Sequence, residues 1–195
     1  MAFWIGLAIF ILASIVAERL LPPQYKKFMP ILVMCVLTFF GLFRYEIGTD
    51  YDWYIVLFDT VKIDDLYPEP TFLLLVEFLH QFHFSYQVMF IAYELPIMLL
   101  LWSGIRYYTK DTEIQILIVA LYYCLQYFFS LNGIRQGLSM VLIFWGYRYC
   151  LERSLWKYLL VVALAASMHY SAVVAAVLYF VPNRVFSWYR YAVVF

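Results

Sequence analysis

Charged side chains are scarce in this chain, where they make up 13% of the 195 residues while hydrophobic residues make up 66%. A soluble domain carries roughly a quarter charged residues, so this chain cannot cover itself with polar surface. The formal net charge is zero, which excludes the concentrated basic surface that nucleic-acid binding requires. We therefore expect an integral membrane protein that has no nucleic-acid partner.

Several kinds of site are missing as well. The three cysteines lie in or beside apolar runs, and no set of His, Cys, Asp and Glu has the spacing of metal ligands. The chain has no Gly-rich phosphate loop of the Walker type, so we expect neither a metal nor a cofactor. The N-terminus lacks the basic region of a cleaved signal peptide, which predicts that the first apolar run remains as a helix.

Long apolar runs dominate the sequence instead. An α-helix needs about 20 apolar residues to cross a bilayer, and six runs approach this length. They predict an all-α fold, a single polytopic helical bundle over residues 1–195 with about six membrane-spanning helices. The runs cover residues 2–17, 28–43, 84–107, 113–129, 134–150 and 155–181. A seventh run from 185 to 195 is cut short, which predicts that the sequence is the N-terminal part of a longer protein.

Residues 71–82 form a shorter apolar segment that carries Glu77 and His80. It is too short and too polar to span the membrane, so we predict an interfacial or re-entrant helix. With this choice, the loops on one side hold eight Lys and Arg residues and those on the other side three. The positive-inside rule then places an acidic loop, residues 44–70, and the turn at 130–136 on the extracytoplasmic side.

Two polar motifs lie at this side. Arg44 ends an apolar run, where its planar fork suits bidentate phosphate binding, although a snorkelling anchor is the alternative. Gly48 is predicted to turn the chain into a short helix, with Thr49 as its cap. Asp50 is expected in the first turn, on the same face as Tyr54.

The second motif opens the run at 134–150. Asn132 is a natural N-cap, and Gly133 with Gly137 forms a small-xxx-small pair that lets another helix approach. Arg135 lies at a helix N-terminus, which already favours anions. The motif therefore indicates an anion site at the outer leaflet, with a snorkelling arginine as the alternative.

His169 interrupts the apolar run at 155–181, among small residues. An ionisable residue within a membrane span is by default a candidate for function, and histidine exchanges protons near neutrality. The alternative is an interhelical hydrogen bond. Glu94, in an earlier span, could pair with a buried arginine, and Pro96 could kink that span.

In their order and approximate spacing, these motifs together resemble the EpsG family of bacterial membrane proteins, within the Wzy-like polysaccharide polymerases. The matching residues are Phe43-Arg44-Tyr45, Gly48-Thr49-Asp50, Tyr54, Glu69-Pro70, Ile134-Arg135-Gln136, and Ala165 with His169-Tyr170-Ser171-Ala172. The resemblance implies a multi-pass glycosyltransferase of the bacterial cytoplasmic membrane. Such an enzyme joins polyprenyl-diphosphate-linked oligosaccharide repeat units at the outer leaflet, in exopolysaccharide or capsule biosynthesis.

The resemblance also suggests a role for each candidate and for possible partners. Arg44, Arg135, Asn132 and Gln136 would bind the lipid diphosphate; His169 and Asp50 would catalyse; Tyr54 and Glu69 would bind sugar. The expected partners are the lipid-linked glycan, membrane lipids and other polysaccharide assembly proteins. A transporter or flippase of lipid-linked sugars, or a non-catalytic subunit, would also use such residues. The candidates gather toward one leaflet, which favours one-sided chemistry.

Overall fold

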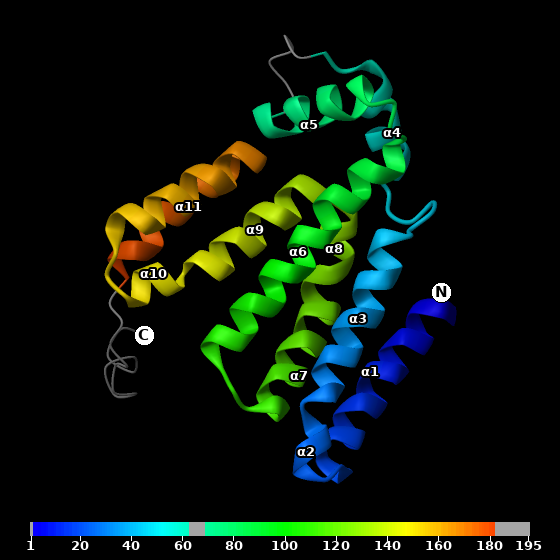
Figure 1. Cartoon of the computed structure of the whole chain (residues 1–195), viewed down its shortest axis with the longest axis vertical. Coiled ribbons are helices and arrows are strands. Elements are labelled where there is room, and N and C mark those ends of the chain that lie inside the picture. Colours follow the sequence, from blue (N-terminus) through cyan, green and yellow to red (C-terminus); the bar gives the residue numbers. More distant parts are fainter. Residues whose placement is uncertain (1, 63–68, 182–195) are drawn as a thin grey trace, which may run out of the picture.

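The computed structural model describes residues 2–62 and 69–181, and this part of the chain is helical and contains no strand (Figure 1). Within these two described segments, four helical stretches are long and apolar enough to cross a membrane: Phe3–Leu20, Pro23–Leu42, Tyr86–Tyr108 and Thr112–Asn132. They correspond to α1 (Ala2–Leu20), α2 (Pro23–Lys26) with α3 (Phe28–Leu42), α6 (Tyr86–Tyr108), and α7 (Thr112–Tyr122) with the π-helix η1 (Tyr123–Tyr127) and α8 (Phe128–Asn132). The predicted all-α polytopic bundle is confirmed.

The outer faces of these helices suit a lipid environment. On α1, a row of exposed aliphatic side chains recurs at helical spacing, with exposed fractions of 54% or more. The opposite face of α1 contributes Leu7 and Ile11 to the core, where they pack with residues of α3 and α7. The exposed row comprises Ile5, Ile9, Leu12, Val16 and Leu20.

Two ends of the bundle can be distinguished in Figure 1. One end, which we call the loop end, carries α4 (Tyr51–Thr60) and α5 (Pro70–Gln81), with α5 lying across the tops of the steep helices. The other end, which we call the turn end, carries α2 and the connection between α6 and α7. The short segment predicted at 71–82 is thus a helix that does not run along the bundle. Part of the acidic loop, residues 63–68, and the run from 185 lie outside the described residues.

The last two predicted spans need correction. The run at 134–150 is divided into α9 (Ile134–Gly146) and α10 (Arg148–Leu151), and the run at 155–181 into α11 (Leu155–Met168) and the 3₁₀-helix η2 (Tyr170–Phe180). The chain leaves the helical conformation at His169, whose φ of −158° and ψ of 117° are extended.

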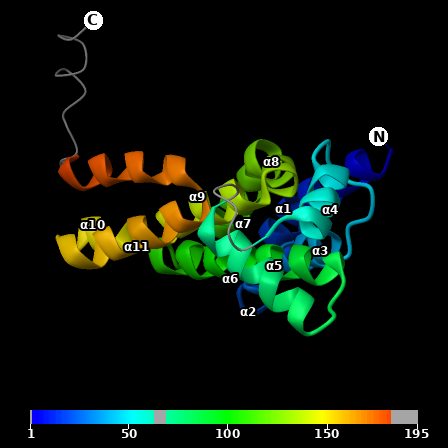
Figure 2. The ribbon, with the colours of Figure 1, turned by 90° about the horizontal axis from the view of Figure 1, so that it is seen from above.

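From this break η2 runs back along α11 (Figures 1 and 2). The Tyr158 hydroxyl donates to the Ala175 carbonyl at 2.8 Å, and the Tyr179 hydroxyl donates to the Arg153 carbonyl at 2.9 Å. These bonds close a helical hairpin. Apolar character alone could not reveal its turn, because both arms are equally apolar.

Glycine permits the close packing of α8 and α9. A Cβ atom at Gly137 would lie 2.8 Å from the Cβ of Ser130, so only glycine fits there. Gly133 has no such neighbour within 3.5 Å and instead forms the turn between the two helices. Of the predicted glycine pair, Gly137 therefore allows close helix packing, whereas Gly133 allows the turn.

Candidate functional site

A buried carboxylate joins three distant segments of the chain at the loop end. Glu69, which is 2% exposed, accepts a hydrogen bond from Nη1 of Arg135 through Oε2. Its Oε1 lies 2.8 Å from Nδ1 of His169 and 3.4 Å from the backbone nitrogen of Tyr170. We call Glu69, Arg135 and His169 the Glu69 cluster. Two of the predicted site residues, Arg135 and His169, thus meet through a third.

The local backbone conformation at each of the three residues directs its side chain toward the other two. Glu69 precedes Pro70, and the residue before a proline is held in an extended conformation, here with φ −57° and ψ 151°. Its side chain therefore does not follow the helix that Pro70 starts. Arg135 lies in the first turn of α9, and His169 is presented by the extended break after α11.

The tautomer of His169 follows from this arrangement. An ionised carboxylate can only accept hydrogen bonds, so Nδ1 of the imidazole carries a proton and donates it in a hydrogen bond to Glu69. In the neutral ring Nε2 then holds a lone pair, and no described residue bonds it. The His169 side chain is 29% exposed, more than Arg135 or Glu69 in the same cluster. His169 is therefore the member whose free nitrogen can meet a substrate.

Aromatic rings enclose the arginine of the cluster. The guanidinium carbon of Arg135 lies 5.4 Å from the ring centroid of Phe72 and 5.9 Å from that of Tyr54. Such contacts stabilise a cation, more strongly where water is excluded. The charge of Arg135 is balanced by Glu69, so the cluster is neutral overall until His169 takes a proton.

Arg44 lies apart from the cluster but close to the same helix turn. It is 2% exposed, donates from Nη1 to the carbonyl oxygen of Leu131, and stacks its guanidinium 4.0 Å from the Phe90 ring centroid. Its Nε and Nη2 atoms have no hydrogen-bond partner among the described residues. Desolvation by burial lowers the pKa of Arg44 to about 10, although Glu94 partly opposes this shift. Arg44 therefore still carries its charge at neutral pH.

Tyr54 separates the two arginines. It is buried on α4, with ring centroids 6.2 Å from Phe72 and 6.3 Å from Phe90, the two rings that contact the guanidiniums. Burial raises the pKa of Tyr54, while Arg135 and Arg44 both act to lower it. Tyr54, which was predicted to bind sugar, thus lies among the aromatic rings between Arg44 and Arg135.

The loop that contains Gly48 packs against the turn before α9. Gly48 has a φ of 101°, and a Cβ atom there would lie 2.5 Å from Oδ1 of Asn132. Two predictions about caps are wrong: Asp50, not Thr49, occupies the N-cap of α4, and Gly133, not Asn132, occupies that of α9. Neither helix start receives a side-chain capping bond.

The remaining candidates border this contact. Asp50 is exposed and accepts a hydrogen bond of 3.2 Å from the Thr49 hydroxyl. Gln136 is half-buried in the first turn of α9, beside Gly133. A cavity of about 310 Å³ opens where the loop meets the turn. Its lining consists of Trp4, Ile47, Gly48, Thr49, Phe128, Leu131 and Asn132.

Glu94 does not form the ion pair that was considered for it. Both of its carboxylate oxygens are buried without a hydrogen-bond partner among the described residues, and no ion pair forms with Arg44. Its side chain instead fills the space beside Gly41, where a Cβ atom would collide with it. Arg44 and Glu94 therefore interact only at longer range.

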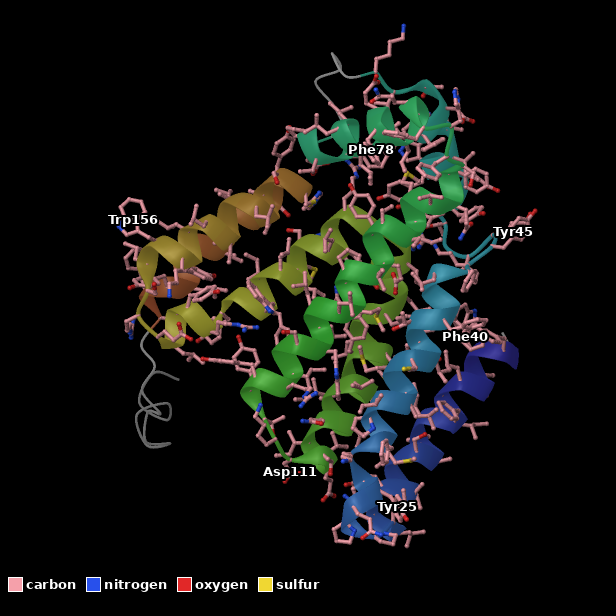
Figure 3. All side chains as sticks on the ribbon, in the orientation of Figure 1. Tyr25, Phe40, Tyr45, Phe78, Asp111 and Trp156 are labelled. Atoms are coloured by element: carbon pink, nitrogen blue, oxygen red, sulfur yellow. The ribbon has the colours of Figure 1, made fainter. Side chains whose placement is uncertain are left out.

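Sequence reasoning undervalued Glu69, which it assigned only to sugar binding. The available signal was an acidic residue immediately before a proline, in a loop predicted to lie on the same side of the membrane as two arginines. Figure 3 shows Tyr45, the neighbour of Arg44, pointing away from the bundle, in keeping with its exposed fraction of 66%. The inward turn of Arg44 is thus a property of that position and not of the whole loop.

Among known proteins, the family model that matches the chain is described as the EpsG family, and it covers residues 26–195. No curated protein and no solved structure matches the chain. The matched segment contains every member of the Glu69 cluster, together with Arg44 and Asp50. The chain belongs to the EpsG family and is a membrane protein of polysaccharide biosynthesis.

Proposed function

We propose that this protein is a glycosyltransferase that polymerises polyprenyl-diphosphate-linked oligosaccharide repeat units at the extracytoplasmic face of the membrane. The observation that carries the proposal is the bond between the buried Glu69 carboxylate and His169 Nδ1. A carboxylate that fixes an imidazole in this way leaves Nε2 as a positioned general base. Family membership supports the polysaccharide context.

The reaction is a displacement at the anomeric carbon of the donor glycan. The hydroxyl oxygen of the acceptor sugar bonds to this carbon while its proton passes to Nε2 of His169. The bond between the anomeric carbon and the lipid diphosphate breaks, and the diphosphate leaves with the electron pair. Glu69 stabilises the imidazolium that forms, because its Oε1 already bonds Nδ1.

The arginines serve the leaving group. Arg44 holds the Leu131 carbonyl through Nη1, so its Nε and Nη2 edge is the side that could bind a diphosphate in a bidentate manner. When His169 takes the proton, the cluster of Arg135, Glu69 and His169 changes from neutral to a net charge of plus one, at the moment when the diphosphate gains negative charge. Cationic groups in a dry site stabilise such charge most effectively.

The other candidates would define the edge of the site. Asp50 is exposed at the start of α4, and a carboxylate there suits the hydroxyls of an incoming sugar. Asn132 and Gln136 flank Gly133 at the turn, between the cavity beside Thr49 and the start of α9. We assign these two amides to the lipid diphosphate.

Membranes containing the whole protein and a lipid-linked repeat unit test this function. Wild-type membranes should convert the repeat into a ladder of longer lipid-linked glycans, and His169→Ala membranes should slow this conversion by about 10²- to 10⁴-fold, the usual contribution of a general base. Equal chain lengths for wild type and the His169→Ala variant would refute the assigned base. Movement of an unextended repeat across the membrane, without polymer, would indicate transport instead.

A further inference from the structure

An apolar groove begins directly beside the Glu69 cluster. It has a volume of about 580 Å³ and lies among α5, α6, α9 and α11, which bring together distant parts of the chain (Figure 1). The lining is Thr71, Leu74, Leu75, Ala92, Tyr93, Pro96, Leu100, Leu138, Leu142, Trp145, Leu164 and Met168. A volume of this size is typical of small-molecule sites.

One face of α9 connects the cluster to the groove. The groove residues Leu138, Leu142 and Trp145 follow Arg135 at steps of three, four and three residues, so all four share one helical stripe. The stripe runs for about 15 Å at 1.5 Å per residue. A buried guanidinium therefore heads a long apolar surface.

Two other walls of the groove reach the cluster as well. Thr71 follows Glu69 by two residues and donates its hydroxyl to the Ser167 carbonyl at 2.5 Å. Met168 directly precedes His169. The mouth of the groove is thus formed by the same segments of α5 and α11 that hold the charged groups.

The side chains of the lining favour a flexible hydrocarbon over another helix. Helices associate in membranes through small residues that allow close backbone approach. Of the small residues that serve this purpose, the lining has Ala92 and Thr71, and most of its other side chains are leucine, methionine or aromatic. Large mobile side chains with a void between them suit an acyl or isoprenoid chain, which can follow their irregular surface.

We infer that this groove holds the isoprenoid segment next to the diphosphate of the lipid-linked substrate. The inference rests on the proposed function and adds a second contact to it: Arg135 and Arg44 meet the diphosphate while the stripe on α9 holds the first isoprene units. The remainder of the polyprenol lies in the bilayer. Recognition of the substrate then depends on its isoprenoid chain as well as on its diphosphate head group.

Crosslinking tests the groove without any turnover. The whole protein in vesicles is exposed to polyprenyl diphosphate that carries a diazirine on the isoprene unit nearest the phosphate, and the labelled peptides are mapped by mass spectrometry. Labelling should fall on α9 between 138 and 145 and on α11 near Met168, and unlabelled polyprenyl diphosphate should suppress it. Equal labelling of these sites by a diazirine phospholipid would overturn the inference, as would labelling confined to other surfaces.

A kinetic experiment can test whether the groove distinguishes long from short isoprenoid chains. Leu142 lies one turn deeper than Leu138, so Leu142→Trp should block the groove beyond its mouth. We expect kcat/KM for a polyprenyl-linked repeat to fall about tenfold, as loss of a few buried methylene contacts implies, while a geranyl-linked repeat is affected much less. The control is Leu125→Trp, which adds the same ring to a 75% exposed position in a separate hollow beside α7.

The two proposals fail in different ways. If wild type polymerises both substrates and Leu142→Trp lowers both equally, or lowers neither, the groove assignment is wrong while the polymerase assignment stands. If wild type makes no polymer, the polymerase proposal fails, and the crosslinking result alone decides whether the groove binds isoprenoid diphosphate.

Discussion

The two ends of the bundle each bury a glutamate, and their surroundings differ in kind. At the turn end, Glu18 is 1% exposed, accepts a hydrogen bond of 2.7 Å from the Thr112 hydroxyl and lies 3.7 Å from Lys26 Nζ. At the loop end, Glu69 meets an arginine and a histidine and adjoins the groove. Glu18 joins the ends of α1, α2 and α7, whereas Glu69 orients a group that can exchange protons.

Burial of a charged side chain does not by itself indicate a catalytic role. Both carboxylates tie distant helices together, so each is expected to contribute to folding. The distinguishing feature of Glu69 is its partner His169, which keeps an unbonded nitrogen and partial exposure. Substitutions made in pairs, one at each end, can separate the shared structural part from the chemical part.

The largest expected effect is that of Glu69→Gln, with Glu18→Gln as its matched control. Glu69→Gln removes the charge that balances Arg135 and leaves one acceptor oxygen where Arg135 and His169 now use two, so polymerisation should fall by about 10²- to 10⁴-fold. Breaking a buried ion pair also destabilises a protein by about 3–5 kcal/mol. Glu18→Gln should lower thermal stability in detergent but keep polymerisation within a few-fold of wild type. Equal losses of activity in the two variants would show that Glu69 has no role beyond the structural one that it shares with Glu18.

A smaller effect is expected for Arg44→Lys. Lysine keeps the positive charge but lacks the planar fork, so diphosphate binding through two nitrogens is lost and kcat/KM should fall about tenfold. Arg19→Lys is the control, because Arg19 forms an exposed ion pair with Glu113 at 2.7 Å and such pairs contribute little. If Arg44 only anchors a helix end, the two variants will have the same small effect.

Sequence patterns predicted the elements of this fold better than their contacts. Runs of apolar residues gave the main helices, because a bilayer imposes a length and a composition on any segment that crosses it. They also placed Arg44, Arg135 and His169 at one end of the bundle. This was possible because the Lys and Arg residues of each loop, and the number of predicted spans between loops, can be counted from the sequence. The end that faces the cytoplasm stays a prediction.

The centre of the site could not be found in this way. Glu69 is 66 residues from Arg135 and 100 residues from His169, and no local pattern specifies which of several loop carboxylates turns inward. The break at His169 was missed because the segments on both sides of it are largely apolar and together are long enough for one membrane span. The groove was missed for a similar reason, since its four walls come from four separate helices.

The smallest expected effect concerns the backbone of the loop end. Gly48 has a φ of 101° and faces Asn132, so Gly48→Ala forces a side chain into a strained conformation and a close contact. Such strain costs about 1–3 kcal/mol. Gly6 on α1 is the matched control, because a Cβ atom there meets nothing within 4 Å and alanine favours a helix. Thermal unfolding in detergent should show a lower midpoint for Gly48→Ala and an equal or higher one for Gly6→Ala. Since the Gly48 loop packs on the turn before Arg135, polymerisation by Gly48→Ala should also decline by a few-fold, and an unchanged rate would show that the loop does not help to position the site.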